Sequence, residues 1–372
     1  MPLHTLGVNI PRSWHGITFG DVMSCVTAIL FYWQPGVDHQ AVMQWIIDHW
    51  FFSSVAFCSM FGTFVSHKLL EWGGMGFYAL LYLLEGYSFL PGSKTLKAAK
   101  IDPNEPWAWT NPDVRVGEKY KSLQTKSIWY IIKYHVAVSI VQFLIFTTAI
   151  SYSWSEGRFN WNWIAGHPEL SRADPATIPS KATVAYQCLV STFVAETGFY
   201  FAHRLCHETR LYYWHKRHHE YSDSTVYATF YVGFLDSVLT DFIPAGFGIV
   251  YFEMHQWTVW MFTLPLIANA LRVHCGYDNA KLLSLLGFNP AMTLPMCTDA
   301  ERTHDMHHRY NTCNYGGAYF FWDRLLGTWM DPDEEIANKK AGKPIITPGS
   351  KLQQFNGATV QPINETANKK AD

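Results

Sequence analysis

Nine of the 17 histidines fall into four short motifs, and these motifs are the part of the sequence best suited to chemistry. Residues four apart on a helix share a face, so an HxxxH or HxxHH pattern predicts a patch of imidazoles that can hold a metal ion. The motifs read HRLCH, HKRHH, HCGY and HDMHH, and they contain His203, His207, His215, His218, His219, His274, His304, His307 and His308. The expected role of these residues is therefore metal binding.

The size of this set predicts two metal ions, because one tetrahedral ion takes only four ligands. Imidazole suits zinc, copper, iron and nickel about equally. The sequence shows no nucleophile for hydrolysis, so a pair of open-shell ions that activates oxygen is favoured, and iron is the hypothesis. Soluble di-iron bundles use Glu and Glu-x-x-His ligands. The acids near the motifs are expected here only to orient the imidazole rings, and they are Glu208, Glu220, Asp278 and Asp305.

The composition indicates that these motifs belong to a membrane protein. Of the 372 residues, 49% are hydrophobic and only 16% are charged, which excludes a disordered chain and favours contact with lipid. The 28 Lys and Arg residues and the 30 Asp and Glu residues give a net charge of −2, so no large basic surface indicates nucleic acid. The seven cysteines form no CxxC pair, which argues against a disulfide framework and against a thiolate zinc site.

Apolar stretches long enough to cross a bilayer predict the elements that position the histidines. The predicted fold is all-α: a polytopic membrane helical bundle of about four spans plus a hairpin, with a cytosolic histidine-rich helical cap. The spans cover residues 17–33, 42–65, 128–150 and 182–202, and the hairpin covers 226–252 and 255–273. Acids and prolines in the hairpin leave open whether it crosses the bilayer twice or is re-entrant. The shorter run at 75–90 is expected at the interface or as a half-buried helix.

Basic residues predict the orientation of the bundle. The connection 66–127 contains eight Lys and Arg residues, whereas 34–41 contains none, so the longer connection is expected in the cytosol. Alternation of the spans then places 203–225 and 274–372 on the same side. All nine motif histidines therefore fall at one membrane face, a result obtained without using the histidines themselves.

Glu196 is an acid within a predicted span, seven residues before His203 and so on nearly the same helix face. A carboxylate within a bilayer is costly unless it has a function. Two interpretations stay open: Glu196 contacts the metal ligands or the substrate as a catalytic residue, or it is a structural residue whose carboxylate reaches toward the interface.

The histidine motifs, together with HDMHHRYNTCNYGGAYFFWDRLLGT, resemble the membrane fatty acid hydroxylase and sterol desaturase superfamily over about residues 182–331. HCGYD and the NYGG and FWDRLLGT segments are most similar to the C-4 methylsterol oxidase branch. The chain departs from that branch after HKRHHE, where a Pro-containing stretch and a further histidine are usual. Here the chain reads YSDSTVYATFYVGFLDSV, which puts the substrate in doubt more than the metal centre.

The resemblance implies an integral, multi-pass protein of the endoplasmic reticulum membrane, with the histidine motifs and the C-terminus in the cytosol. It implies two non-haem iron ions held by the nine motif histidines, and it implies O2 as oxidant. Electrons would come from NAD(P)H through a separate donor, cytochrome b5 or its reductase, since no fused cytochrome b5 module is apparent. Lys369 and Lys370, fourth and third from the end of the sequence, match a dilysine retrieval signal, which a cytosolic C-terminus would permit.

We expect three regions: N-terminal spans with their cytosolic connection (1–127), a di-iron hydroxylase domain (128–331) and a polar cytosolic tail (332–372). The leading functional hypothesis is monooxygenation of a sterol or isoprenoid lipid, with C-4 methylsterol oxidation as the reaction. Within the superfamily the alternatives are squalene epoxidation, desaturation, and hydroxylation of a fatty acid or sphingoid base. From other classes, a catalytically silent lipid- or metal-binding membrane protein and a zinc-dependent hydrolase are the alternatives.

Overall fold

The structure is a computed structural model of the chain. It describes residues 32–86, 92–102, 127–136, 139–140, 143–144, 152–153, 158–159, 172–285 and 300–348, apart from 35, 135, 209 and 222–223. These residues are helical except for loops and one antiparallel pair of two-residue strands, β1 (Tyr152–Ser153) and β2 (Arg158–Phe159). The predicted all-α class is confirmed. The predicted span 17–33 and most of 128–150 lie outside the described residues, although 127–134 are helical.

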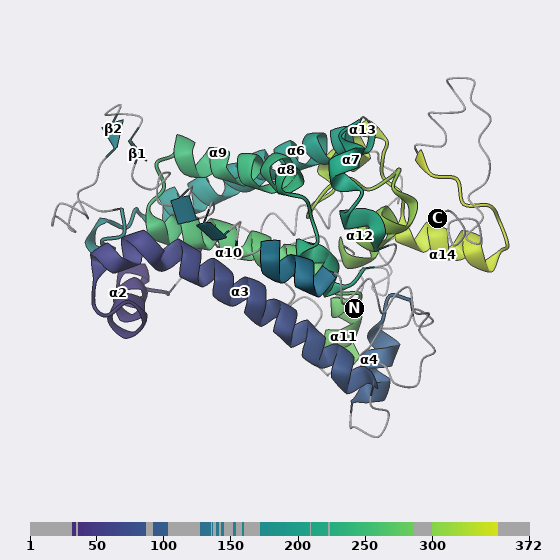
Figure 1. The fold of residues 1–372 in the computed structure, drawn as a ribbon, viewed down its shortest axis with the longest axis horizontal. Coiled ribbons are helices and arrows are strands. Elements are labelled where there is room, and N and C mark those ends of the chain that lie inside the picture. Colours follow the sequence, from purple (N-terminus) through teal and green to yellow (C-terminus); the bar gives the residue numbers. More distant parts are fainter. Residues whose placement is uncertain are drawn as a thin grey trace.

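Long helices lying side by side form the body of the molecule (Figure 1). Helix α6 packs against α9, and α10 packs against both α3 and α6. A hydrophobic core between them includes Ile47, Cys188, Ile249, Trp257 and Trp260. The helices are α2 (His39–Trp50), α3 (Val55–Gly86), α6 (Lys181–Glu208), α9 (Ile243–Tyr251) and α10 (Gln256–Val273).

Two of the predicted elements are wrong in their boundaries. The predicted span 42–65 is interrupted between α2 and α3, where Phe52 and Ser53 both have a φ of 55° and so cannot continue a right-handed helix. The stretch 75–90 is not a separate interfacial helix, since α3 continues without a break to Gly86. Glu85, which seemed to interrupt the apolar run, is buried.

The predicted hairpin 226–252 and 255–273 is present as two helical segments joined at Phe252–His255. The first segment begins with η5 (Val226–Phe230) and continues as α8 (Phe234–Ser237), the π-helical turn η6 (Val238–Phe242) and α9. Pro244 has no N–H for the carbonyl four residues earlier, and just before it Ile243 N donates instead to Val238 O, five residues back. The second segment, α10, starts at the N-cap His255, whose Nδ1 accepts from Trp257 N.

The hairpin returns the chain to the end of the molecule where short helices collect. In Figure 1, α7, α12 and α13 lie at the opposite end from α2 and the strands. A second hydrophobic core includes Tyr82, Tyr221 and Tyr277. The remaining short helices are α4 (Ser93–Ala99), η3 (Pro175–Thr177), α7 (Tyr212–His215), η4 (His218–Glu220), α11 (Asn279–Leu285), α12 (Ala300–Tyr310), α13 (Phe321–Leu326) and α14 (Pro332–Lys340).

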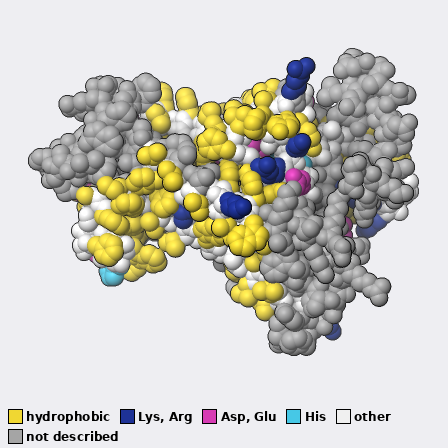
Figure 2. Space-filling model, viewed as in Figure 1, with side chains coloured by type: hydrophobic (Ala, Val, Ile, Leu, Met, Phe, Trp, Pro, Cys, Tyr) yellow, Lys and Arg dark blue, Asp and Glu magenta, His cyan; other side chains and the backbone are white. Residues whose placement is uncertain are grey.

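Large hydrophobic side chains cover much of the outer surface of the long helices (Figure 2). Exposed examples are Leu69, Phe77 and Leu80 on α3, Phe193 and Phe201 on α6, and Ile243, Phe247 and Tyr251 on α9. Contiguous apolar surface is typical of contact with lipid or with another protein. Among the described residues, one continuous helical stretch, Phe234–Tyr251, is both long and apolar enough to cross a bilayer by itself.

Candidate metal centre

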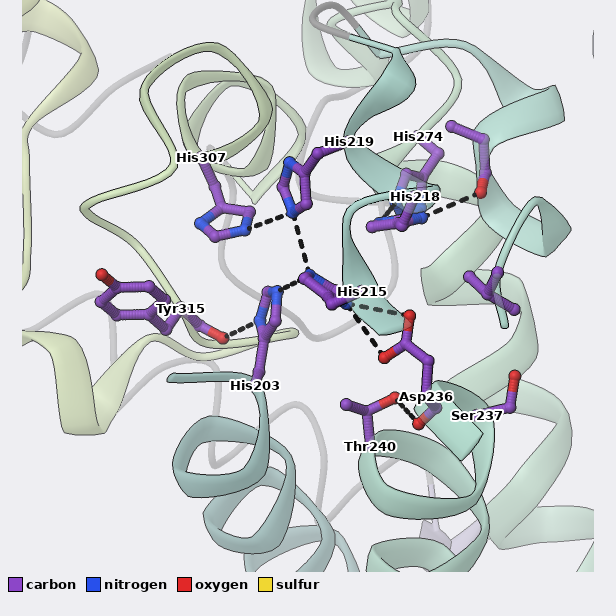
Figure 3. A network of polar contacts seen from close by, with 12 residues as sticks. His203, His215, His218, His219, Asp236, Ser237, Thr240, His274, His307 and Tyr315 are labelled. Atoms are coloured by element: carbon purple, nitrogen blue, oxygen red, sulfur yellow. Dashed lines mark hydrogen bonds and ion pairs between the residues drawn. The ribbon is translucent and has the colours of Figure 1, made fainter. Parts of the chain in front are cut away.

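The fold brings all nine motif histidines together. Their ring nitrogens form two neighbouring groups, within each of which the potential ligand atoms lie within 4.8 Å of one another. The first group is His203, His207, His215, His219 and His307, and the second is His218, His274, His304 and His308. Figure 3 shows rings of both groups converging from α6, from the segment around α7 and η4, and from α12. Two sites that could each hold a metal ion are therefore present.

The sequence predicted that each HxxHH motif forms one patch of imidazoles, but in the structure each motif contributes to both groups. In each motif the histidines four apart enter one group and the remaining histidine enters the other. His215 and His219 belong to the first group and His218 to the second, whereas His304 and His308 belong to the second and His307 to the first. HKRHH divides in this way across two short helices, since α7 ends at His215 and a 3-10 turn begins at His218, whereas HDMHH divides in the same way within the single helix α12. The motifs thus bridge the two groups.

The spacing of the inward-facing nitrogens fits metal coordination. His215 Nε2 lies 3.1 Å from His203 Nε2 and 2.9 Å from His219 Nε2. In the second group, His274 Nε2 lies 3.2 Å from His218 Nε2 and 2.9 Å from His304 Nε2. With metal–nitrogen bonds of about 2.1 Å, neighbouring ligand nitrogens are about 3.0 Å apart in an octahedral site and about 3.4 Å apart in a tetrahedral one.

The outward-facing nitrogens establish which ring nitrogen holds the proton. His203 Nδ1 donates to the carbonyl of Tyr315 at 2.8 Å, and His215 Nδ1 donates to both carboxylate oxygens of Asp236 at 2.9 Å. Across the other site, His218 Nδ1 donates to Ala228 O and His274 Nδ1 to Ala270 O. A carbonyl or carboxylate only accepts, and a neutral imidazole has one N–H. In each pair the two facing Nε2 atoms therefore carry no proton, and each directs a lone pair at the other.

Two lone pairs about 3 Å apart repel each other unless a cation lies between them. The donor set consequently fits a metal ion in each group. Burial and the neighbouring rings reinforce this chemistry, because burial lowers the pKa of His203, His218 and His308 well below its usual value. The pKa of His274 falls to about 4 for the same reason. The rings are thus held in the neutral form that binds metal.

Asp236 is the functional residue that sequence analysis missed. In the sequence it is only one of several acids in the predicted hairpin. In the structure it is buried and accepts from His215 through both carboxylate oxygens. The acids that were expected to orient the rings have other partners: Glu208 contacts Arg204, Glu220 contacts Tyr231, Asp278 contacts Lys281 N, and Asp305 contacts Ser224 N and Arg309. No sequence signal separates these cases, because the partner of His215 is 21 residues away and across a loop.

Glu196 lies beside the site but its carboxylate is occupied. It is buried and accepts three backbone N–H groups, from Ala318, Tyr319 and Phe320, at 3.1 Å each. Asp323 holds the preceding part of the same loop by accepting from Tyr315 N and Gly316 N at 2.7 Å. The Tyr315 carbonyl in turn accepts from His203. This geometry favours the structural interpretation of Glu196: it fixes the loop that orients a ligand.

A cavity of about 640 Å³ opens onto the two groups. Its lining includes His203 and His215 from the first group and His218, His274 and His304 from the second. Away from the histidines the wall is mainly apolar and comes from α6, α9 and α10, with residues such as Phe199, Ile249 and Leu266. The site can therefore hold an apolar molecule with one part directed at the imidazoles.

Comparison with known proteins agrees with this arrangement. The fatty acid hydroxylase family model matches residues 188–328, which contain all nine histidines and Asp236. Over this segment the chain is similar to the fatty acid hydroxylase family. The resemblance predicted from the motifs is thereby confirmed.

Three relatives extend this comparison. Methylsterol monooxygenase 1 of Danio rerio is 25% identical over 76% of this chain and 86% of its own length. Methylsterol monooxygenase 1 of Gallus gallus is 33% identical over 38% of this chain and 45% of its own length. The C-4 methylsterol oxidase of Schizosaccharomyces pombe is 27% identical over 44% of this chain and 54% of its own length. The latter two matches thus span only about half of each relative, and no solved structure matches the chain.

Proposed function

We propose that this protein is an O2-dependent membrane monooxygenase that uses two iron ions to oxidise a sterol or isoprenoid lipid, with C-4 methylsterol oxidation as its reaction. The observation that carries the proposal is a pair of adjacent imidazole groups that line an apolar cavity. Within each group, nitrogen lone pairs of neighbouring rings face one another.

Different residues of the site have different roles in the proposed reaction. The nine histidines would hold the two ions, and the bound iron pair supplies the one- and two-electron redox chemistry that amino-acid side chains lack. Asp236 holds His215 with its lone pair inward, and backbone carbonyls do the same for His203, His218 and His274. The apolar walls from α6, α9 and α10 exclude water and orient the lipid so that one carbon faces the rings.

The sterol class is supported by the cavity and by the relatives. A volume of about 640 Å³ accommodates a rigid polycyclic lipid, and the cavity lies among helices with apolar outer surfaces, from which a lipid can enter. The relatives that align over the largest part of this chain include a methylsterol monooxygenase. Squalene epoxidation and fatty acyl hydroxylation need the same centre but a differently shaped substrate, so substrate analysis separates them from the proposed reaction.

The cellular setting follows from the same proposal. The protein would be a multi-pass protein of the endoplasmic reticulum membrane, with the histidine groups at its cytosolic face. There they are accessible to a separate electron donor, cytochrome b5 or its reductase, that draws on NAD(P)H. The basic connection 66–127 supports this orientation.

Complementation tests the proposal directly. The full chain would be expressed in a host that lacks C-4 methylsterol oxidation, and sterol intermediates would be measured. We expect the accumulated 4,4-dimethylsterols to disappear, and we expect His215→Ala and His274→Ala to abolish this effect. Rescue only of a host blocked at squalene epoxidation would reassign the substrate. Bound iron without any O2 consumption would favour a silent lipid- or metal-binding protein, and turnover without O2 would favour a hydrolase.

A further inference from the structure

The polar side chains on the cavity wall are almost all satisfied within the protein. Outside the histidine groups, examples are Glu71 with Lys68, Tyr134 with Ser237, and Asn269 with the Gly317 carbonyl. Two side chains on the described wall lack a hydrogen bond or ion pair to the protein: the hydroxyl of Thr229 and the carboxyl of Asp241.

Asp241 faces the cavity rather than the outside of the molecule. Its side chain is accessible, yet protein atoms surround it and Asp236 is close enough to interact with it electrostatically, so the accessible surface is that of the cavity. Other residues of the same segment, among them Thr240 and Pro244, line the cavity as well.

The π-helical turn explains how this acid reaches the cavity. Five residues of a regular α-helix turn by about 500°, which would place Asp241 about 140° away from Asp236. The turn η6 is wider, with a bond from Ile243 N to Val238 O, and this reduces the angle between the two acids. Asp236 accepts a hydrogen bond from His215, and Asp241, one turn farther along, lines the same cavity.

A carboxyl group on an apolar cavity wall needs a hydrogen-bond donor, and a lipid that displaces water from the cavity must supply that donor itself. A carboxyl group keeps an acceptor oxygen in either protonation state, so a hydroxyl group is a suitable partner. The same argument is weaker for Thr229, whose neutral hydroxyl costs less to leave unpaired than a carboxyl does.

We propose that Asp241 binds a hydroxyl group of the lipid in this cavity, so the substrate class is a lipid alcohol whose hydroxyl lies close to the carbon that is oxidised. The statement about the oxidised carbon rests on the proposed function, whereas the binding of the alcohol does not depend on it. It agrees with a C-4 methylsterol, in which the hydroxyl is on C-3, the neighbouring ring carbon. It disfavours squalene, which has no hydroxyl.

Equilibrium binding tests the proposal without turnover. The full chain in lipid nanodiscs would be titrated with a radiolabelled 4,4-dimethylsterol in competition with either the unlabelled 3-hydroxy compound or its 3-deoxy analogue. We expect wild type to prefer the alcohol by about ten- to a hundredfold. Asp241→Leu should bind both compounds equally, and Asp241→Asn, which keeps an acceptor oxygen, should retain part of the preference. Thermal melting and iron content would verify that each variant is folded.

Thr229→Val is the matched control, because it removes the other unpaired group at nearly constant volume. It should keep the wild-type preference. The inference is wrong if Asp241→Leu keeps the preference, if Thr229→Val loses it, or if wild type binds neither compound. These results are separable from those for the reaction: a preference that depends on Asp241 without sterol oxidation would contradict only the proposed function, and sterol oxidation without that preference would contradict only this inference.

Discussion

At the scale of single residues, the metal centre depends on groups that hold imidazoles in one tautomer. Asp236 does this for His215 through two contacts of 2.9 Å from a buried position. Replacing Asp236 with Asn leaves one acceptor oxygen and adds an N–H that cannot bond to the ring N–H. Because such supporting residues typically affect metal affinity by 10- to 100-fold, we expect a loss of about that size in Asp236→Asn.

Iron titration of the purified variant would measure this loss. Glu208→Gln is the matched control, since Glu208 follows His207 directly in sequence but forms a partly exposed ion pair with Arg204. Its iron affinity should equal that of wild type. Equal affinities for all three proteins would show that Asp236 does not support a metal ligand.

The two interpretations of Glu196 predict different measurements. As the acceptor of three buried N–H groups it should act on stability: Glu196→Gln keeps one acceptor oxygen and should lose about 1–3 kcal/mol of unfolding free energy. Turnover per bound iron pair should then stay near the wild-type value. A variant with unchanged melting temperature and strongly reduced turnover per iron pair would instead identify Glu196 as catalytic.

The histidine set was accessible to sequence analysis because two independent patterns agreed. Motif spacing selected nine rings, which the structure brings together, and the charge distribution separately predicted that they lie at one membrane face. The division of the rings into groups of five and four was not accessible. It depends on how the two HxxHH segments lie against each other in the fold, because HKRHH divides across two short helices and HDMHH divides in the same way within the single helix α12.

At the scale of elements, hydropathy located α6 and α10 well but did not detect where helices break or widen. The break at Phe52 and Ser53 lies in an apolar, aromatic run without glycine or proline, so the usual signals are missing. The π-helical turn before Pro244 was likewise visible only as a proline in a predicted span. Both features depend on packing between helices that are distant in sequence.

Close packing of α6 on α9 gives the element-scale prediction. A Cβ atom on Gly248 would lie 2.2 Å from Ser191 Oγ and 3.3 Å from Ser191 Cα, whereas one on Gly246 would meet nothing within 4 Å. Gly248→Ala should therefore lose about 1–3 kcal/mol through overpacking. Gly246→Ala should be neutral or gain up to about 1 kcal/mol from the higher helix propensity of alanine.

Thermal melting of the two variants, each in the same detergent or nanodisc, would compare them. The pair is well matched, because both substitutions add one methyl group to the same helix two residues apart. Similar melting temperatures for the two variants would mean that α6 and α9 are not packed as closely as described.

At the scale of the whole molecule, the bound ions should link folding to pH. Burial lowers the pKa of His274 from 6.5 to about 4, and it lowers the pKa of His304 and His307 in the same direction. Below pH 6.5 the unfolded chain therefore binds more protons than the metal-free folded chain. Stability is present above this pH and is lost as the pH falls toward 4, by roughly 3 kcal/mol for His274 alone.

Chelation should expose this dependence, because a bound ion keeps its ligand rings deprotonated and adds its own binding free energy to the folded state. We expect the chelator-treated protein to melt at a lower temperature than the iron-loaded protein at pH 7. We also expect the treated protein to lose further stability at pH 6 and pH 5, while the iron-loaded protein changes little until protons displace the metal. His49→Ala, which alters an exposed ring on α2, should leave both curves unchanged. Identical curves with and without chelator would mean that the nine rings do not bind metal in the folded protein. Removal of two ions from the nine rings that hold them must change the free energy of folding.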